Sequence, residues 1–166
     1  MLGLLWSRPR GFRIALLTLT TAGCAEPETC GPSQAVVKRV IDGDTVELES
    51  GERVRYLLVD APETTNGKNA CFGAEAREFN RHLVEGRSIE LAYESRCRDR
   101  YDRLLAYVYV DGIDVNASLV KDGYACVLHI PPDGDARVDA FRGFERDAQA
   151  SAVGLWSACE TKPCGD

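Results

Sequence analysis

The feature that most constrains the fold is a series of short apolar segments between residues 36 and 64, separated by turn-forming residues. The segment from Val36 to Ile41 leads into an Asp-Gly pair, and Thr45 to Leu48 then alternates between apolar and polar residues as a half-buried strand does. Residues 54–59 are mostly apolar, and Pro62 ends this segment because proline has no N–H to donate to a neighbouring strand. The pattern predicts a meander of three short strands.

Carboxylates stand at the ends of these segments. Asp44 precedes one strand, Asp60 follows another, and Glu63 comes shortly after it. A meander brings such strand ends together, and two neighbouring carboxylates repel each other unless a cation or a proton lies between them. An oxygen-rich pair with a third carboxylate nearby suits a hard cation such as Ca²⁺. Taken singly, the aspartates also fit ordinary turn positions, and Arg55 fits a surface salt bridge with Glu47.

Three motifs in the chain are informative together. They are Ile41-Asp42-Gly43-Asp44-Thr45, Arg55-x-Leu57-Leu58-Val59-Asp60-x-Pro62-Glu63-Thr64 and Asp99-Arg100-Tyr101-x-Arg103-x-Leu105-Ala106-Tyr107. In this order and approximate spacing they resemble the staphylococcal nuclease (thermonuclease) family, in its secreted or lipoprotein bacterial form. The resemblance extends from about Val36 to Trp156. A single short motif would be a weak signal, whereas three in register are a strong one.

The resemblance implies a metal site and a residue that acts on water. Asp44 and Asp60 match the carboxylates that bind Ca²⁺ in the family. Ala61 stands where the family usually has threonine, and since that position contributes its backbone carbonyl, alanine is compatible with the role. Glu63 matches the glutamate proposed as the general base, so the resemblance implies that it activates or orients the attacking water.

The resemblance also implies the residues that hold the substrate. Arg55 and Arg103 match two arginines that grip the phosphate, a task that suits the planar guanidinium because it forms paired hydrogen bonds with phosphate oxygens. Arg100 belongs to the same basic segment, and Tyr101 matches a tyrosine near the nucleotide-binding pocket. The chain departs from the family near His129, which we expect at the edge of that pocket.

Together these features predict an exported, Ca²⁺-dependent endonuclease. It would hydrolyse phosphodiester bonds in DNA or RNA, and the resemblance implies products with a 5′-hydroxyl and a 3′-phosphate. One alternative is a non-catalytic module that binds nucleic acid or protein, because the same barrel often binds without cutting. Another is a structural lipoprotein of the cell envelope.

The net charge bears on the choice between a nuclease and these alternatives. Without residues 1–23, which hold three arginines and no acidic residue, the chain has 17 basic and 26 acidic residues and a net charge of −9. Proteins that bind nucleic acid usually carry a basic surface. A basic surface here must be local, so we expect a monomer that binds its substrate weakly and in a salt-sensitive way.

The rest of the chain predicts a β-rich α+β fold. Further strands are expected at residues 88–93 and 104–110, and about three helices, the first after Gly73 and the last from Arg137 to about Ser151. The family resemblance implies that the five main strands form a five-stranded oligonucleotide/oligosaccharide-binding (OB) barrel. In the strand at 54–59, alternation places Arg55 and Asp60 on opposite faces.

The N-terminus has the pattern of an export signal. Residues 1–23 combine three arginines with a short apolar run that is too short to span a membrane. Small residues before Cys24 resemble a lipoprotein processing site, which would place a lipid anchor on this cysteine and the protein in the cell envelope. We expect a tether at residues 24–35, a nuclease domain at 36–158 and a tail at 159–166.

The remaining six cysteines suggest disulfides, because an even number is typical of exported chains. With the family's fold as a guide, the expected pairs are Cys71–Cys97, Cys126–Cys159 and Cys30–Cys164. A zinc site is the competing interpretation, but the chain contains no C-x-x-C pair.

Overall fold

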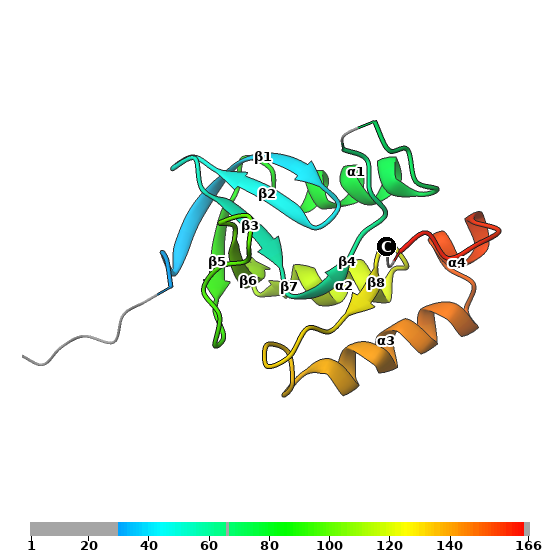
Figure 1. The fold of residues 1–166 in the computed structure, drawn as a ribbon. Coiled ribbons are helices and arrows are strands. Elements are labelled where there is room, and N and C mark those ends of the chain that lie inside the picture. The colour runs from blue at the N-terminus through cyan, green and yellow to red at the C-terminus, as the bar shows by residue number, and fades with distance from the viewer. Residues whose placement is uncertain (1–29, 66, 165–166) are drawn as a thin grey trace, which may run out of the picture.

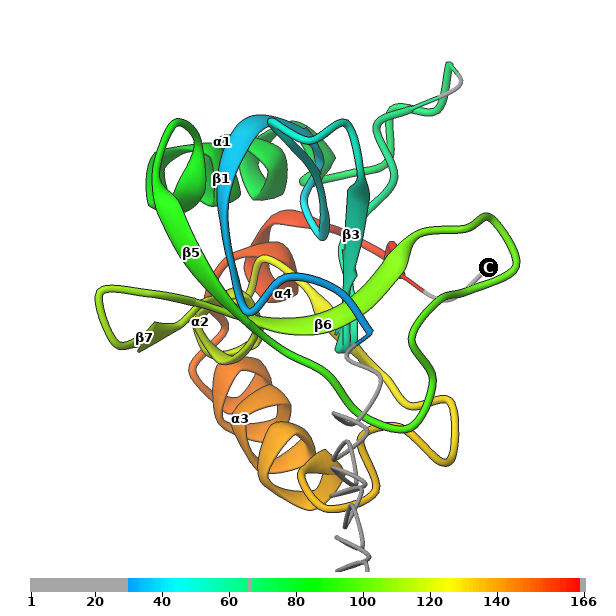
Figure 2. The same cartoon turned by 90° about the vertical axis from the view of Figure 1, so that its left-hand side faces the viewer.

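A closed five-stranded β-barrel forms the centre of the computed structural model, which describes residues 30–65 and 67–164 (Figure 1). Its strands are β1 (Gln34–Asp42), β2 (Thr45–Leu48), β3 (Arg53–Tyr56), β5 (Ser88–Ala92) and β6 (Leu104–Val110). They pair in the order β3-β2-β1-β5-β6, and a parallel pairing of β6 with β3 closes the ring. Figure 2 shows these strands from the side away from the helices. The predicted β-rich α+β fold with an OB-type barrel is confirmed.

Apolar side chains fill the barrel. β2 is buried along its whole length, and β6 is buried at all but one position. Among the largest fully buried side chains are Leu48, Tyr56, Ile89 and Leu104, each from a different strand. Closely packed interiors resist deformation, so the strand ends that carry polar residues are held in fixed positions.

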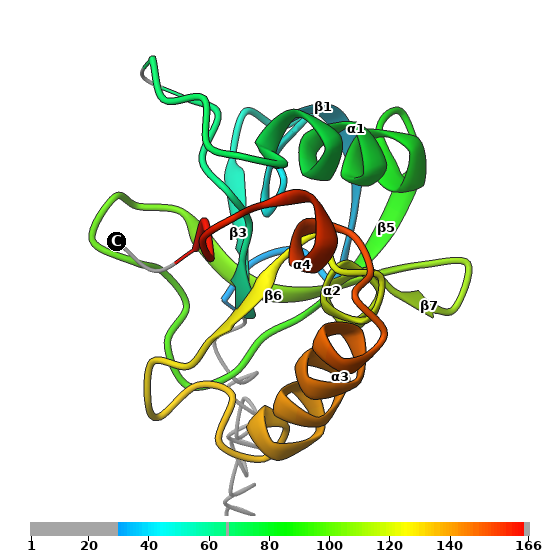
Figure 3. The same cartoon turned by 90° about the vertical axis from the view of Figure 1, so that its right-hand side faces the viewer.

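Four helices gather on one side of the barrel (Figure 3). They are α1 (Gly73–Val84), α2 (Val115–Lys121), α3 (Val138–Ala150) and the short α4 (Leu155–Ala158). α1 places Ala76 against the β1–β2 turn and Gly73 against residues 62–64 of the loop after β4, and α3 buries Phe141. A short hairpin strand, β7 (Ile113–Asp114), precedes α2. α1 lies against the turn between β1 and β2 that carries the carboxylates, because the side-chain amide of Asn80 donates to the Asp42 carbonyl at 3.4 Å.

The segment predicted as one strand at residues 54–59 is two strands. β3 ends at Tyr56, and β4 (Leu58–Asp60) leaves the barrel to pair with β8 (Cys126–Leu128). Leu58 has a φ of 61°, in the left-handed region that reverses the regular alternation of side chains. Arg55 and Asp60 therefore face each other, and the predicted placement on opposite faces is wrong.

The disulfides differ from all three expected pairs. The structure contains Cys30–Cys97, Cys71–Cys159 and Cys126–Cys164. The first pair arises because residues 30–33 run beside the end of β5 and the residue after it: the Leu91 amide donates to the Ser33 carbonyl at 2.9 Å and the Tyr93 hydroxyl to the Pro32 carbonyl at 2.8 Å. The other two pairs form because the chain returns after α4 along the loop before α1 and then along β8.

The N-terminal boundary of the domain differs slightly from the expected one. β1 begins at Gln34, two residues before the expected start of the domain. The expected export signal and Cys24 lie outside the described residues. Within the described part of the chain, no helix has the length and apolar character needed to cross a membrane.

Candidate active site

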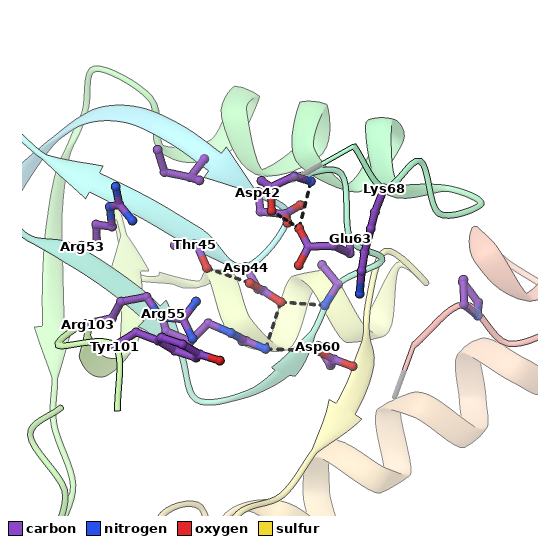
Figure 4. Close-up of a pocket in the computed structure, with 14 residues that line it drawn as sticks. Asp42, Asp44, Thr45, Arg53, Arg55, Asp60, Glu63, Lys68, Tyr101 and Arg103 are labelled. Carbon is purple, nitrogen blue, oxygen red and sulfur yellow. Dashed lines mark hydrogen bonds and ion pairs between the residues drawn. The ribbon is translucent and has the colours of Figure 1, made fainter. Parts of the chain in front are cut away.

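A polar cavity of about 470 Å³ lies where the β1–β2 turn, β3, β4 and the loop after β4 meet (Figure 4). It is lined by the predicted residues Asp44, Arg55, Asp60, Ala61, Glu63, Tyr101 and Arg103, and also by Ile41, Asp42, Thr45, Arg53, Thr65, Lys68 and Pro163. Four separate segments of the sequence, 41–45, 53–68, 101–103 and Pro163, therefore contribute to one cavity. The acids at positions 44, 60 and 63 share this cavity, as the predicted site requires.

Asp44 is the buried centre of the cavity. Its side chain accepts hydrogen bonds from the Ala61 amide at 2.8 Å and from the Thr45 hydroxyl at 2.9 Å. Gly43 makes this approach possible, because a Cβ atom at that position would lie 2.5 Å from the Cβ of Ala61. The Asp-Gly turn thus brings β4 against β2 and fixes the orientation of the Asp44 carboxylate.

Arg55 lies between two of the carboxylates. Its Nη2 atom is 3.1 Å from Oδ2 of Asp44 and 3.2 Å from Oδ1 of Asp60. Its Nη1 atom donates to the carbonyls of Tyr56 and Val59, on both sides of the left-handed turn. The guanidinium is only 13% exposed. The break between β3 and β4 therefore creates the ion-pair arrangement.

This geometry provides a test of whether the residues fit a metal ion. Among the described residues, no group of three or more His, Cys, Asp or Glu side chains stands close enough to hold one. Two carboxylates do converge, because one cationic nitrogen of Arg55 contacts both Asp44 and Asp60. Hard cations take carboxylate oxygens and complete their coordination with water or phosphate oxygens. The two oxygens therefore fit part of the coordination shell of such an ion.

Asp42 and Glu63 form a second carboxyl pair in the cavity. Burial, together with the hydrogen bond to Glu63, raises the pKa of Asp42 to about 7. The same hydrogen bond, helped by Thr65, lowers the pKa of Glu63. Glu63 accepts hydrogen bonds from both the amide and the hydroxyl of Thr65, and Asp42 accepts one from the Thr64 hydroxyl at 3.1 Å. Within the pair, Asp42 therefore holds a proton more readily than Glu63 does, and Glu63 ionises first.

Arg103 and Tyr101 form the opposite wall. The Nε atom of Arg103 donates to Oδ2 of Asp99 at 2.7 Å, which orients the guanidinium. Tyr101 is 64% exposed, and its ring contacts the guanidinium carbons of Arg100 and Arg103 at 4.7 and 5.3 Å from the centroid. An exposed aromatic ring beside two cations is a surface on which a nucleic acid base can stack.

A second cavity of about 630 Å³ adjoins the first. Both are lined by Arg55, Tyr101 and Arg103, and the second extends over Arg100 and Ile130. The two cavities together form a continuous recess with arginines at their boundary. Such a recess is large enough for more than one unit of an extended anionic ligand.

A model of the family described as "Staphylococcal nuclease homologue" matches residues 53–158. The chain belongs to this family. Endonuclease YncB of Bacillus subtilis is 40% identical over 126 residues, which cover 72% of this chain and 59% of YncB. SPbeta prophage-derived endonuclease YokF of the same organism is 37% identical over 126 residues, covering 72% of this chain and 42% of YokF. The chain spans about half the length of these two relatives. Thermonuclease of Staphylococcus intermedius is 32% identical over 126 residues, covering 73% of this chain and 74% of the thermonuclease.

In this staphylococcal nuclease homologue, two of the predicted substrate residues lie outside the first cavity. Arg100 lines the second cavity, where its Nη2 atom lies 2.7 Å from the Tyr101 hydroxyl. His129 has its Nε2 atom 2.7 Å from Oδ1 of Asp135. Its neighbour Ile130 lines the second cavity. The role of His129 at the pocket edge stays a prediction.

Several residues of the cavity were not predicted as members of the site. Asp42 is the most important, since it shares a proton with Glu63. Its place in the same Asp-Gly-Asp motif as Asp44 was the available signal. Lys68 and Pro163 also line the cavity, but they come from a polar loop and from the C-terminal segment, where the sequence shows no pattern that links them to the motifs.

Proposed function

We propose that the protein is a nuclease that hydrolyses phosphodiester bonds in DNA or RNA with Ca²⁺ as its metal ion, leaving a 5′-hydroxyl and a 3′-phosphate. The observation that carries the proposal is the position of Arg55 between Asp44 and Asp60, in one cavity with Glu63 and Arg103. The names of the relatives, two endonucleases and a thermonuclease, support the same activity.

The two arginines would hold the phosphate. Arg55 and Arg103 line the same cavity from β3 and from the segment before β6. Guanidinium groups donate paired hydrogen bonds to phosphate oxygens and stabilise the negative charge that builds on them in the transition state. Tyr101 lies beside Arg103 and offers its ring to a neighbouring base.

Glu63 would orient the attacking water and accept its proton. Its pKa is lowered by the hydrogen bonds from Asp42 and Thr65, so it is ionised at neutral pH and available as an acceptor. Asp42, whose raised pKa favours its neutral form, would reduce the negative charge that the incoming phosphate meets. This second effect favours the approach of an anionic substrate to an acidic cavity.

Asp44 and Asp60 would hold the calcium ion. The ion supplies positive charge that neutralises the phosphate oxygens and polarises the phosphorus. Because Nη2 of Arg55 contacts both carboxylates, a cation held by them would compete with the guanidinium for these oxygens. We propose the Ala61 carbonyl as a further ligand.

Cleavage of plasmid DNA and of RNA, each in Ca²⁺ and in chelator, tests the proposal. We expect cleavage only in Ca²⁺. Glu63→Ala and Arg103→Ala should lose most turnover, while Arg146→Ala, an exposed arginine of α3, should retain it. Absence of cleavage by the oxidised protein in Ca²⁺ would refute the nuclease assignment.

The net charge of −9 outside residues 1–23 favours a second candidate, a binding module without catalysis. A pure binding module has no need for a metal ion between Asp44 and Asp60. A calorimetric Ca²⁺ titration of wild type and of Asp44→Asn therefore separates the two candidates. Metal binding that disappears in the variant supports the nuclease.

We also propose that the protein is exported as a monomer and carries a lipid on Cys24. The three disulfides support an oxidising compartment, since cytosolic proteins seldom keep such bonds. Intact-mass measurement of the protein from membranes tests the lipid, because a diacylated N-terminal cysteine adds a defined mass.

A further inference from the structure

A row of charged residues crosses the outer face of the barrel beside the active-site cavity. Arg39 of β1, Glu47 of β2 and Arg53 of β3 are direct partners across the three strands. Directly opposed residues of antiparallel strands point to the same face of the sheet, and successive residues of a strand point to opposite faces. Val46 and Val54, which precede Glu47 and follow Arg53, are fully buried in the core. The three charged side chains therefore share the outer face.

An irregularity in β1 adds a further cation to this row. Val37 pairs with Leu48 and Arg39 with Glu47, so β1 has one extra residue, Lys38, between these two pairs. In such a bulge two residues oppose one residue of the partner strand, which allows both side chains to reach it. The Nζ atom of Lys38 lies 3.0 Å from Oε1 of Glu47, and Nε of Arg39 donates to Oε2 at 3.1 Å. We call this set of four residues the basic row: Lys38, Arg39, Glu47 and Arg53.

The basic row has a net positive charge in an otherwise acidic protein. Three cations and one carboxylate give it a charge of +2, whereas the chain outside residues 1–23 has a charge of −9. Hydrogen bonds from Arg39 and Lys38 lower the pKa of Glu47 to about 2, so this carboxylate is ionised and orients both cations. The side chains of Lys38 and Arg39 are 57% and 56% exposed, and that of Glu47 is 11% exposed. Solvent therefore meets the cations, with the carboxylate beneath them.

The basic row is continuous with the active-site cavity. Arg53 belongs to both, because it also lines the cavity (Figure 4). Thr45 and Arg55, which are partners across β2 and β3 and line the cavity as well, lie two residues along these strands from Glu47 and Arg53. Two residues of a strand span about 7 Å, a step similar to that between neighbouring phosphates of an extended nucleic acid strand. A strand with one phosphate at Arg55 can thus place the next one at the basic row.

We propose that the basic row is a subsite that binds the sugar-phosphate backbone of the substrate next to the scissile phosphate. The proposal rests on the nuclease function proposed above and extends the length of strand that the protein recognises. Arginine and lysine bind phosphate through charge and hydrogen bonds without reading the bases. The subsite therefore increases the affinity for longer strands, while the chemical step remains with the residues of the cavity.

Binding measured against salt concentration tests the subsite directly. Lys38→Gln with Arg39→Gln removes two charges and keeps hydrogen-bond donors for Glu47. Fluorescence anisotropy of a labelled single strand of about 12 nucleotides, recorded in chelator to prevent cleavage, gives the slope of log K against log salt. This slope should become shallower by about 1.4, because each phosphate contact on a single strand contributes about 0.7. For proteins that bind equally at about 1 M salt, this difference means roughly 25-fold weaker binding at about 0.1 M.

Cleavage in calcium separates the subsite from the cavity. For the long strand the double variant should raise KM and leave kcat unchanged. For a dinucleotide, which has a single phosphodiester and cannot occupy the basic row and the cavity together, both constants should stay at the wild-type values. Glu47→Gln, which raises the charge of the row to +3, should instead tighten binding of the long strand and steepen its salt slope.

Arg142→Gln with Arg146→Gln is the matched control, since it removes two exposed charges from α3. This variant should retain the salt slope of the wild type. An unchanged slope in the Lys38 and Arg39 double variant, or an equal change in the α3 variant, would overturn the subsite. A wild type that binds the long strand with the expected slope but cleaves neither substrate would overturn the nuclease proposal and leave the subsite standing.

Discussion

Replacing Arg55 by methionine tests how the charges of the site are balanced. The side chain of Arg55 is 13% exposed, and those of its partners Asp44 and Asp60 are 8% and 23% exposed. Removing one partner of a buried ion pair costs about 3 kcal/mol, because the buried charge that remains, here the Asp44 carboxylate, loses its counter-ion. In chelator we therefore expect Arg55→Met to lose about 3 kcal/mol of unfolding free energy, which lowers the melting temperature by about 10 °C.

Calcium should offset about half of this loss. In the wild type a calcium ion would compete with the guanidinium for the carboxylate oxygens of Asp44 and Asp60, whereas in the variant this competition is absent. If the affinity for calcium rises about tenfold, saturating calcium stabilises the variant by about 1.4 kcal/mol more than it stabilises the wild type. Catalysis would nevertheless fall, because the phosphate loses one of its two arginines.

The assay is thermal and urea unfolding, followed by circular dichroism, in chelator and in a calcium series. Arg100→Met is the matched control, since Arg100 is exposed and contacts Tyr101 instead of the carboxylates. Its stability should change little, with or without calcium. If Arg55→Met were as stable as the wild type in chelator, or gained no more from calcium, Arg55 would not be the internal counter-ion of this pair.

Three more predictions concern neighbouring residues. Gly43→Ala should lose about 1–3 kcal/mol of stability and most of its activity, because the new methyl group would lie 2.5 Å from the Cβ of Ala61. Urea unfolding measures the stability and a cleavage assay measures the activity. Wild-type values in both would contradict the packing argument. Arg103→Lys should lower kcat about 100-fold with little change in stability, since lysine cannot donate paired hydrogen bonds to phosphate oxygens. Steady-state kinetics on a short oligonucleotide test this prediction. An unchanged kcat would argue against a phosphate-binding role for Arg103. The pKa of Asp42 is raised from 3.8 to about 7 in the folded state, so its stabilising contribution is complete below about pH 4 and is lost as the pH rises through 7. Asp42→Asn should remove this part of the pH dependence, and urea unfolding in chelator from pH 4 to 8 should show a flatter curve than the wild type; equal slopes would contradict the shift.

Much of the site follows from local patterns. The Asp-Gly turn before β2 places Asp44 at a strand end, and Pro62 ends the segment that carries Asp60. These signals depend on neighbours in the sequence, because turn geometry and the missing N–H of proline are local properties. Shared motifs with the staphylococcal nuclease family then connect these turns with the distant Arg103. The barrel and the grouping of the acids were predictable in this way.

The contact between the side chains of Arg55 and Asp60 was not predictable from the alternation of side chains along a strand. A regular strand places them on opposite faces, but the left-handed backbone of Leu58 reverses the order and brings them together. This conformation is stabilised by the pairing of β4 with β8, about 65 residues later in the chain. The disulfide pairs were predicted incorrectly for the same reason, because each pair depends on which distant segments of the chain run side by side.

The sequence by itself determined which chemical groups are available and where each strand and turn begins, since these properties arise within a few residues. Only the tertiary structure decided which of those groups meet. The guanidinium between Asp44 and Asp60, the pairing of the Asp42 and Glu63 carboxyl groups, and the place of Pro163 in the cavity wall all depend on contacts between distant segments. Such contacts are set by burial in a common core and by covalent links across it, and no local pattern contains them.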